Sequence, residues 1–294
     1  MVEIISGKKQ NHWRGPAVLN FFLGGTGIGF YILLVLFGPD SKAGSGNVMD
    51  LLPAALTALG LAAVAVEAGR PFRGLYLFLN VKRSWMSREV VFATLFIVLS
   101  LMERKRGDTV LPMLTATAGV MFVISQAMIL YRSSAVPAWR RPILPLMFIT
   151  ASLLNAFGLA LLLAAADVCP VDEAVLVYGW VCIFLALVTW QKGLYVRTHI
   201  ETPAAVPPIR SHRVRIADAG AGGVLPLLIL AVLLFSGIPP KGAVASAAYA
   251  LCGAFILTCG YYRLQRLITG IDYLVPVSIG TPGESRKHDA FLQT

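Results

Sequence analysis

Residues 67–89 read Glu67-Ala-Gly-Arg-Pro-Phe-Arg-Gly-Leu-Tyr-Leu-Phe-Leu-Asn-Val-Lys-Arg-Ser-Trp-Met-Ser-Arg-Glu89 and separate two long apolar runs. The stretch closes one apolar run with a carboxylate and opens the next with another, and five Lys or Arg lie between them. Ionisable groups at the ends of membrane helices are energetically costly and are therefore candidates for function. The stretch predicts a polar connection between two membrane helices and marks where a site would lie.

The composition of the whole chain is that of an integral membrane protein. Of its 294 residues, 57% are hydrophobic and only 14% are charged, with a mean hydropathy of +0.73. A membrane helix needs about 20 apolar residues to cross a hydrocarbon core of about 30 Å. Eight runs meet or approach that length, at about 16–37, 50–68, 88–102, 109–131, 142–165, 173–196, 219–238 and 242–262.

These runs predict helices, because barrel strands would show alternating segments of about ten residues. We therefore expect an all-α integral membrane protein with eight transmembrane helices, in which spans 1–4 and 5–8 could form two four-helix bundles. Residues 1–275 would be the membrane anchor domain and residues 276–294 a polar C-terminal tail. The third run is short unless its helix begins at Ser84-Trp85.

The distribution of positive charge predicts the orientation. With eight spans, the two termini and the even-numbered connections hold 20 of the 25 Lys and Arg residues. The positive-inside rule then places both termini and the 67–89 connection in the cytoplasm. Arg104-Lys105-Arg106 is the exception, since it falls on the outer side. The net charge of +10 is explained by these connections and by anionic lipid, so no nucleic-acid partner is expected.

The chain lacks the ligands that resident redox centres need. A haem inside a helical bundle usually requires His residues within the spans. The four His residues lie in tails, in connections or near a helix end: His12, His199, His212 and His288. The four Cys residues show no C-x-x-C spacing: Cys169, Cys182, Cys252 and Cys259. We expect no haem, no iron–sulfur cluster and no metal site in this chain.

Small and polar residues inside the spans predict helix packing. The sequence Gly24-Gly25-Thr26-Gly27-Ile28-Gly29 resembles a phosphate loop, but it lies in an apolar span and follows no strand. Gly25 and Gly29 instead allow another helix to approach closely. Gln126 and Asn155 lie within spans, where hydrogen bonds between helices explain them. Four of the five tryptophans lie near predicted cytoplasmic boundaries and are expected to be interfacial anchors: Trp13, Trp85, Trp139 and Trp190.

The segment Glu-Ala-Gly-Arg-Pro after span 2, with Asn80 and Ser84-Trp85-Met86-Ser87-Arg88-Glu89, resembles the membrane-anchor subunit of DMSO reductase-type molybdoenzyme complexes. The Gly-Gly-Thr-Gly of span 1 and the eight-span plan agree with that family. The resemblance implies an electron-transport subunit of anaerobic respiration in the bacterial or archaeal cytoplasmic (inner) membrane. It also implies exchangeable quinone or quinol and two partners, a ferredoxin-like subunit with several iron–sulfur clusters and a molybdenum (or tungsten) bis-pterin catalytic subunit.

The resemblance also assigns residues. In that family, a His in a His-x-Gly-x-Pro motif and a Glu in a Ser-x-Glu motif are implicated at the quinol site. Glu89 matches the second motif, whereas Glu67 stands where the family has His. Quinone reduction takes up two protons, which suits groups that bind protons near neutral pH. We therefore expect Glu67 and Glu89 to exchange protons with quinone. Four residues would lie near the quinone: Arg70, Trp85, Ser87 and Arg88.

Purely structural roles are the alternative for these residues. Glu67 could pair with a neighbouring arginine and only orient the connection, and Trp85 could be an interfacial anchor instead of a surface for the quinone ring. Two other functions stay open, a secondary transporter and a scaffold anchor without quinone chemistry. A transporter is disfavoured by the absence of paired Gly/Pro-broken spans and of a charged site at mid-membrane. If the 67–89 connection is cytoplasmic, the catalytic partner and its substrate are cytoplasmic, and quinone exchanges protons on that side without moving charge across the membrane.

The orientation can be measured by thiol labelling in intact cells. In a variant whose four native Cys residues are replaced by Ala, Leu75→Cys should resist a membrane-impermeant maleimide, because residues 69–88 face the cytoplasm. Gly46→Cys, in the first outer connection, should react. Equal labelling at the two positions in unbroken cells would contradict the predicted orientation.

Overall fold

The computed structural model describes residues 4–5, 15–37, 48–67, 80–103, 110–133, 139, 142–169, 171–200, 219–235, 242–269 and 277–278. Eight α-helices account for most of them: α1 (Gly15–Phe37), α2 (Val48–Glu67), α3 (Trp85–Glu103), α4 (Val110–Arg132), α5 (Leu144–Ala165), α6 (Glu173–Ile200), α8 (Leu225–Phe235) and α9 (Ala243–Thr269). A π-helical turn, η3 (Gly220–Val224), runs directly into α8.

Seven of the described helices are long and apolar enough to cross a membrane, and the helical segment Gly220–Phe235 is apolar but shorter. This confirms the prediction of an all-helical protein with eight apolar helices. Helix α3 begins at Trp85 and is therefore about one turn longer than the apolar run at 88–102. The short β1 (Ile4–Ile5) pairs antiparallel with β2 (Val277–Ser278), which brings segments near the two ends of the chain together. Their cytoplasmic location, and the division at residue 275, stay predictions.

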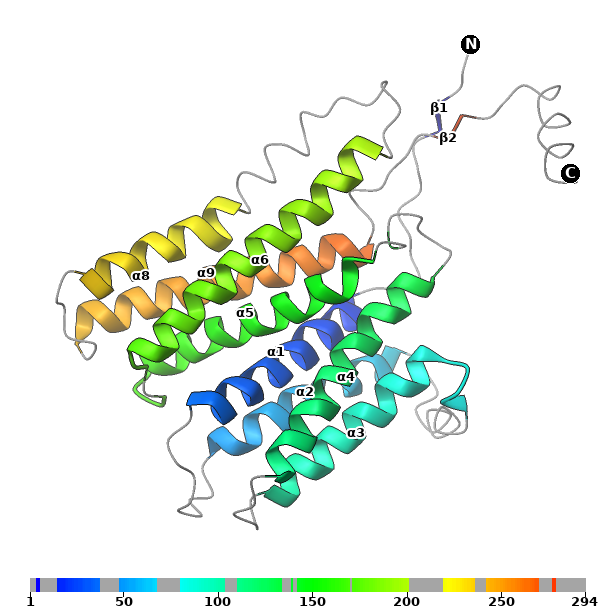
Figure 1. Ribbon diagram of the computed structural model, residues 1–294, viewed down its shortest axis with the longest axis horizontal. Coiled ribbons are helices and arrows are strands. Elements are labelled where there is room, and N and C mark those ends of the chain that lie inside the picture. Colours follow the sequence, from blue (N-terminus) through cyan, green and yellow to red (C-terminus); the bar gives the residue numbers. More distant parts are fainter. Residues whose placement is uncertain are drawn as a thin grey trace, which may run out of the picture.

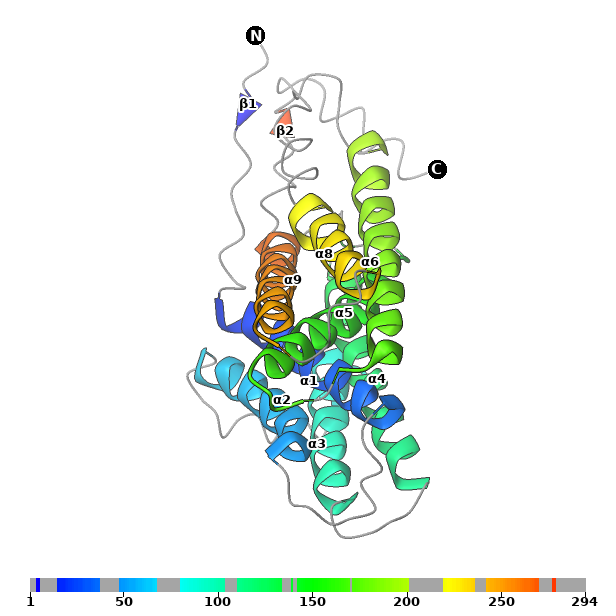
Figure 2. The same cartoon turned by 90° about the vertical axis from the view of Figure 1, so that its left-hand side faces the viewer.

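The helices form two groups that meet along α1 and α5. Figures 1 and 2 show α1–α4 in one group and α5, α6, α8 and α9 in the other. Within the first group, α1 packs along α2 and α3 packs along α4. In the second group, α5 packs against α6 and α9, and the same helix contacts α1 across the boundary. Helix α1 is thus surrounded by neighbours, which explains why two-thirds of its membrane window is buried.

Many large apolar side chains lie on the outward faces of the described helices. Phe30, Phe122 and Phe157 are fully buried between helices, whereas Phe184 and Phe235 are 63% and 79% exposed. Large apolar side chains scattered over the outside of long helices are what a lipid environment requires, since lipid tails replace water as the solvent. The exposed side chains therefore support a membrane location.

Glycines in α1 permit close helix crossings, as the sequence predicts. A methyl group on Gly25 would lie 2.6 Å from Ser152 Oγ of α5, and one on Gly29 would collide with the backbone carbonyl of the same serine. On the opposite side, a methyl group on Gly27 would lie 2.7 Å from the Pro53 carbonyl oxygen of α2. The predicted close approach at Gly25 and Gly29 is confirmed, and α5 is the helix that approaches.

The expectation that Trp139 is an interfacial anchor is wrong. Its side chain is only 1% exposed, and its Nε1 donates a hydrogen bond to the Leu267 carbonyl oxygen at 2.9 Å. This tryptophan therefore contacts the end of α9 rather than lipid. Trp190 is also buried, at 5% exposed.

The α1–α5 crossing generates a stability prediction. Gly29→Val should destabilise the protein by about 1–3 kcal/mol or more, because the obstacle is backbone and cannot rotate away. The fraction of monodisperse protein after heating in mild detergent measures this. Gly15→Val is the matched control, since nothing lies within 4 Å of a Cβ atom added there. Equal heat resistance of the two variants would show that the crossing is loose.

Candidate functional site

Glu89 is a buried carboxylate shared by three helices. It is the fifth residue of α3 and is only 6% exposed. Asn20 of α1 donates from Nδ2 to Glu89 Oε1 at 2.7 Å, and Gln126 of α4 donates from Nε2 to the same oxygen at 3.2 Å. The structure therefore brings together residues that lie 69 and 37 positions apart in the sequence.

Glycines leave the space that the two amides occupy. A methyl group on Gly24 would lie 3.3 Å from Gln126 Nε2, and one on Gly60 of α2 would lie 3.2 Å from Asn20 Oδ1. Asn20 is 3% exposed and Gln126 is fully buried. Gln126 Nε2 also lies 3.4 Å from the backbone oxygen of Asn20, which joins the two amides to each other. The carboxylate and its two donors therefore form one closed cluster.

The partners of Glu89 are neutral. Both of its hydrogen bonds end on Oε1, and Oε2 has no hydrogen-bond donor among the described residues. Helix α1 contains no Asp, Glu, Lys or Arg, and α4 contains only Arg132, at its last position. A buried carboxylate without a cation is stabilised as an ion only by hydrogen bonds, so its charged form is costly. Such a group is suited to bind and release a proton.

Arg88 holds the turn that precedes α3 and does not pair with Glu89. Its Nε donates to the Val81 carbonyl oxygen at 3.0 Å, and its Nη2 donates to the Lys82 carbonyl oxygen at 2.9 Å. Its guanidinium carbon lies 4.2 Å from the centroid of the Trp85 ring. The stacking occupies one face of that tryptophan, which leaves at most the other face for a ligand.

The other predicted site residues have different positions. The Ser87 hydroxyl is fully buried without a hydrogen-bond partner among the described residues, and its backbone N–H lies 3.4 Å from Ser84 Oγ. Residues two apart on a helix face different directions, so Ser87 is not on the Glu89 side of α3. Glu67 is the last residue of α2, and its side chain lies outside the described residues, as does all of Arg70.

A second carboxylate cluster at the other end of α3 was missed by the sequence reasoning. Glu103 accepts hydrogen bonds from the Tyr31 hydroxyl, 2.8 Å from both carboxylate oxygens, and from the Thr115 hydroxyl. The same three helices meet here as around Glu89, some 14 residues or about 21 Å away along α3. A tyrosine late in span 1 and a glutamate ending span 3 were the only signals available.

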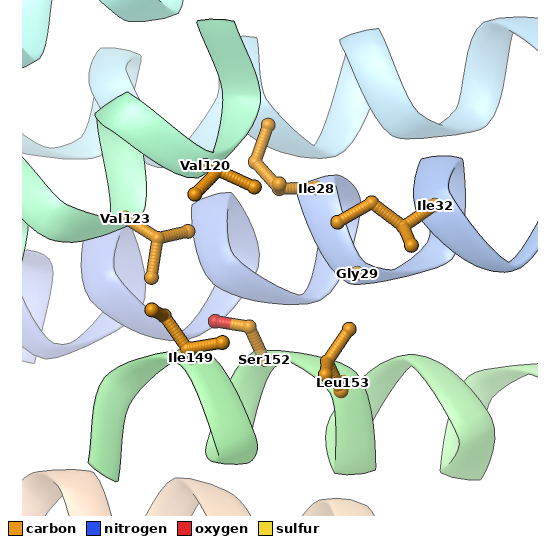
Figure 3. Close-up of a pocket in the computed structure, with 8 residues that line it drawn as sticks. All are labelled: Ile28, Gly29, Ile32, Val120, Val123, Ile149, Ser152 and Leu153. Carbon is orange, nitrogen blue, oxygen red and sulfur yellow. The ribbon is translucent and has the colours of Figure 1, made fainter. Parts of the chain in front are cut away.

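Two kinds of ligand site are relevant to the described part of the chain, a metal site and a pocket between helices. No group of three or more His, Cys, Asp or Glu residues there could hold a metal ion. A small apolar pocket lies between α1, α4 and α5, lined by Ile28, Gly29, Ile32, Val120, Val123, Ile149, Ser152 and Leu153 (Figure 3). The only lining hydroxyl, that of Ser152, donates to the Phe148 carbonyl oxygen. The pocket lining therefore consists of apolar groups and one hydroxyl that is already hydrogen-bonded.

Comparison with known proteins gives one family. The model of the family described as DMSO reductase anchor subunit (DmsC) matches residues 10–202, about two-thirds of the chain. The matched region includes α1–α6 and therefore the whole Glu89 cluster. No curated protein matches the chain significantly.

The contacts of Arg88 predict how the turn before α3 behaves. Arg88→Ala should increase hydrogen exchange at the Arg83 and Ser84 amides by about tenfold, because hydrogen bonds to a charged group contribute about 1.5–3 kcal/mol. Both amides donate to the Asn80 carbonyl oxygen at 3.1 Å, and mass spectrometry of the corresponding peptide reports their exchange. The control is Arg83→Ala, which removes an exposed cation from the same turn. Protection that is equal in the two variants would contradict this role of Arg88.

Proposed function

The chain belongs to the DMSO reductase anchor subunit family, and we propose that it passes electrons between the quinone pool and an iron–sulfur partner. The partner would be a ferredoxin-like subunit that connects to a molybdenum (or tungsten) bis-pterin subunit. The family and the seven long apolar helices make the chain a multi-pass membrane protein. We further propose that the quinone site lies near the connection between α2 and α3.

The observation that carries the proposal is the environment of Glu89. The carboxylate lies one turn inside α3, about 6 Å from the start of the helix. It has two amide donors and no cation among the described residues. A structural carboxylate in a helix interior would normally be paired with Arg or Lys. An unpaired one close to the membrane boundary is typical of a group that exchanges protons.

The proposed reaction transfers two protons together with two electrons. Reduction of one quinone takes two electrons from the iron–sulfur partner and two protons from the protein and the water at that boundary, and gives quinol; oxidation of quinol is the reverse. Glu89 would deliver or accept a proton through Oε2, the oxygen without a hydrogen-bond donor among the described residues. Glu67, at the end of α2, would serve the second proton. The face of Trp85 that Arg88 does not cover would support the quinone ring.

The interior of α1, α3 and α4 supports proton exchange on the Glu89 side only. Beyond Glu89 the next inward positions of α3 are Ala93 and Phe96, both fully buried, and the buried Ser100 follows them. A methyl group on Gly119 of α4 would lie 2.8 Å from Ile28 and 3.3 Å from Phe96, which shows how tightly this layer is closed. Apolar side chains packed at this density interrupt a hydrogen-bonded path for a proton at this layer.

With the cytoplasmic orientation of the 67–89 connection, the proposal includes a location for each partner. The iron–sulfur and catalytic subunits would bind at the cytoplasmic face of the inner membrane. Their substrate would be a cytoplasmic metabolite, for instance a CoA thioester or another organic acid derivative. Because protons would be exchanged on the same side, the reaction would not move charge across the membrane.

The proposal is tested by Glu89→Gln in the intact complex. Gln keeps the shape of the side chain but cannot carry the proton, so electron exchange with a quinone analogue should slow by about 100-fold or more. Exchange with a soluble dye at the iron–sulfur partner should not change. Glu67→Gln should behave similarly but more mildly, and Glu67→His should retain activity, because the family has His there.

The matched control is Asp50→Asn, the same chemical change in the first turn of α2 at the other end of that helix. It should leave quinone exchange at the wild-type rate. Wild-type quinone exchange in both Glu89→Gln and Glu67→Gln would overturn the proposed site. A preparation of the wild-type chain that co-purifies with partners but shows no quinone dependence would favour a scaffold, and one without iron and molybdenum would favour a transporter.

A further inference from the structure

The two amides around Glu89 are arranged asymmetrically. Asn20 Nδ2 and Gln126 Nε2 both point at Glu89 Oε1, and neither reaches Oε2. The carbonyl oxygens of the same amides, Asn20 Oδ1 and Gln126 Oε1, are fully buried and accept no hydrogen bond from the described residues. Four polar atoms are thus oriented so that only N–H groups face the carboxylate.

This arrangement distinguishes the two oxygens of Glu89. A protonated Oε1 would need an acceptor, but both neighbouring amides present N–H groups to it. A protonated Oε2 would keep both existing hydrogen bonds, because the Oε1 of a neutral carboxyl group still accepts. The proton therefore binds to Oε2, and the cluster keeps its geometry in both protonation states.

We propose that Asn20 and Gln126 are positioning residues that hold Oε1, present Oε2 to the exchanging proton and set the pH at which Glu89 loses it. The inference rests on the proposed function for its consequence in quinone exchange, but the amides act on the carboxyl group whether or not quinone is bound. Donors to the charged form of an acid favour that form. The amides therefore oppose the cost of burial and keep Glu89 able to release its proton.

The charged and titratable groups of the surrounding helices are few. Arg88, the nearest in sequence, bonds to the Val81 and Lys82 carbonyl oxygens. Tyr31 and Glu103 bond to each other at the far ends of α1 and α3. Tyr131 and Arg132 end α4, while α2 contains Asp50 and Glu67 at its two ends. Among these groups, no side chain that the structure describes donates to Glu89, whose hydrogen bonds come from the two amides.

The experiment follows the carboxyl group directly. The full-length chain in liposomes is titrated by infrared difference spectroscopy, and the C=O stretch of Glu89 is assigned as the band lost in Glu89→Gln. Gln126→Met preserves volume but removes the donor, so the midpoint of the band should rise by about one pH unit. Asn20→Leu should raise it further, because its hydrogen bond is shorter, 2.7 Å against 3.2 Å. In the intact complex, the pH profile of quinone exchange should move in the same direction.

Asn155→Leu is the matched control. Asn155 is another buried amide, 1% exposed, but it lies on α5 against Gly260 of α9 and not at Glu89. Its substitution should leave the midpoint unchanged. Should Gln126→Met fail to insert, Gln126→Asn keeps an amide that is one methylene too short and should raise the midpoint as well.

The outcomes separate the two proposals. A midpoint that stays at the wild-type value in both amide variants, or that moves equally in Asn155→Leu, would overturn the inference about the amides. A Glu89 band that does not titrate would also overturn it. Unchanged quinone exchange in Glu89→Gln would instead overturn the proposed function, and the infrared midpoints would still decide the role of Asn20 and Gln126.

Discussion

A carboxylate inside a helix bundle is the constraint on which this half of the molecule depends. Glu89 lies among α1, α3 and α4, where its charge is not matched by a cation among the described residues. Removing a charged group from water is costly unless hydrogen bonds replace its hydration. Here the replacement comes from one amide on each of the two other helices. The depth and rotation of α1 and α4 relative to α3 are therefore fixed by the need to bring Asn20 and Gln126 to one oxygen.

Helix α1 meets this constraint while it also joins the two halves of the protein. Asn20, Gly24, Ile28 and Tyr31 follow one another at helical spacing and face α3 and α4, which provide Glu89, Phe122, Phe96 and Glu103 along the same line. Gly25 and Gly29 form a second stripe that faces Ser152 of α5. The first stripe has polar residues at its ends, which hydrogen-bond to α3. The second stripe has no side chains, so α5 can approach the helix closely on that side.

Much of this fold was predictable from the sequence, because run length and hydropathy are set by the thickness of a membrane. The start of α3 at Trp85, the close approach at Gly25 and Gly29 and the interhelical role of Gln126 all followed from local patterns. Asn20 was not singled out, since one polar residue in an apolar run does not indicate which helix it faces. Trp139 was misassigned for the same reason: its partner, the Leu267 carbonyl oxygen, lies 128 positions away.

Neighbouring residues at the start of α3, within the 67–89 stretch, have different structural roles. Arg88 binds the carbonyl oxygens of the preceding turn and covers one face of Trp85, so it fixes where α3 begins. That start determines the depth of Glu89, because each residue of a helix adds about 1.5 Å along its axis. If α3 began one turn later, Glu89 would lie at the very start of the helix, out of reach of Asn20 and Gln126. The basic residue therefore acts on the buried acid indirectly, by placing it at the depth where the two amides reach it.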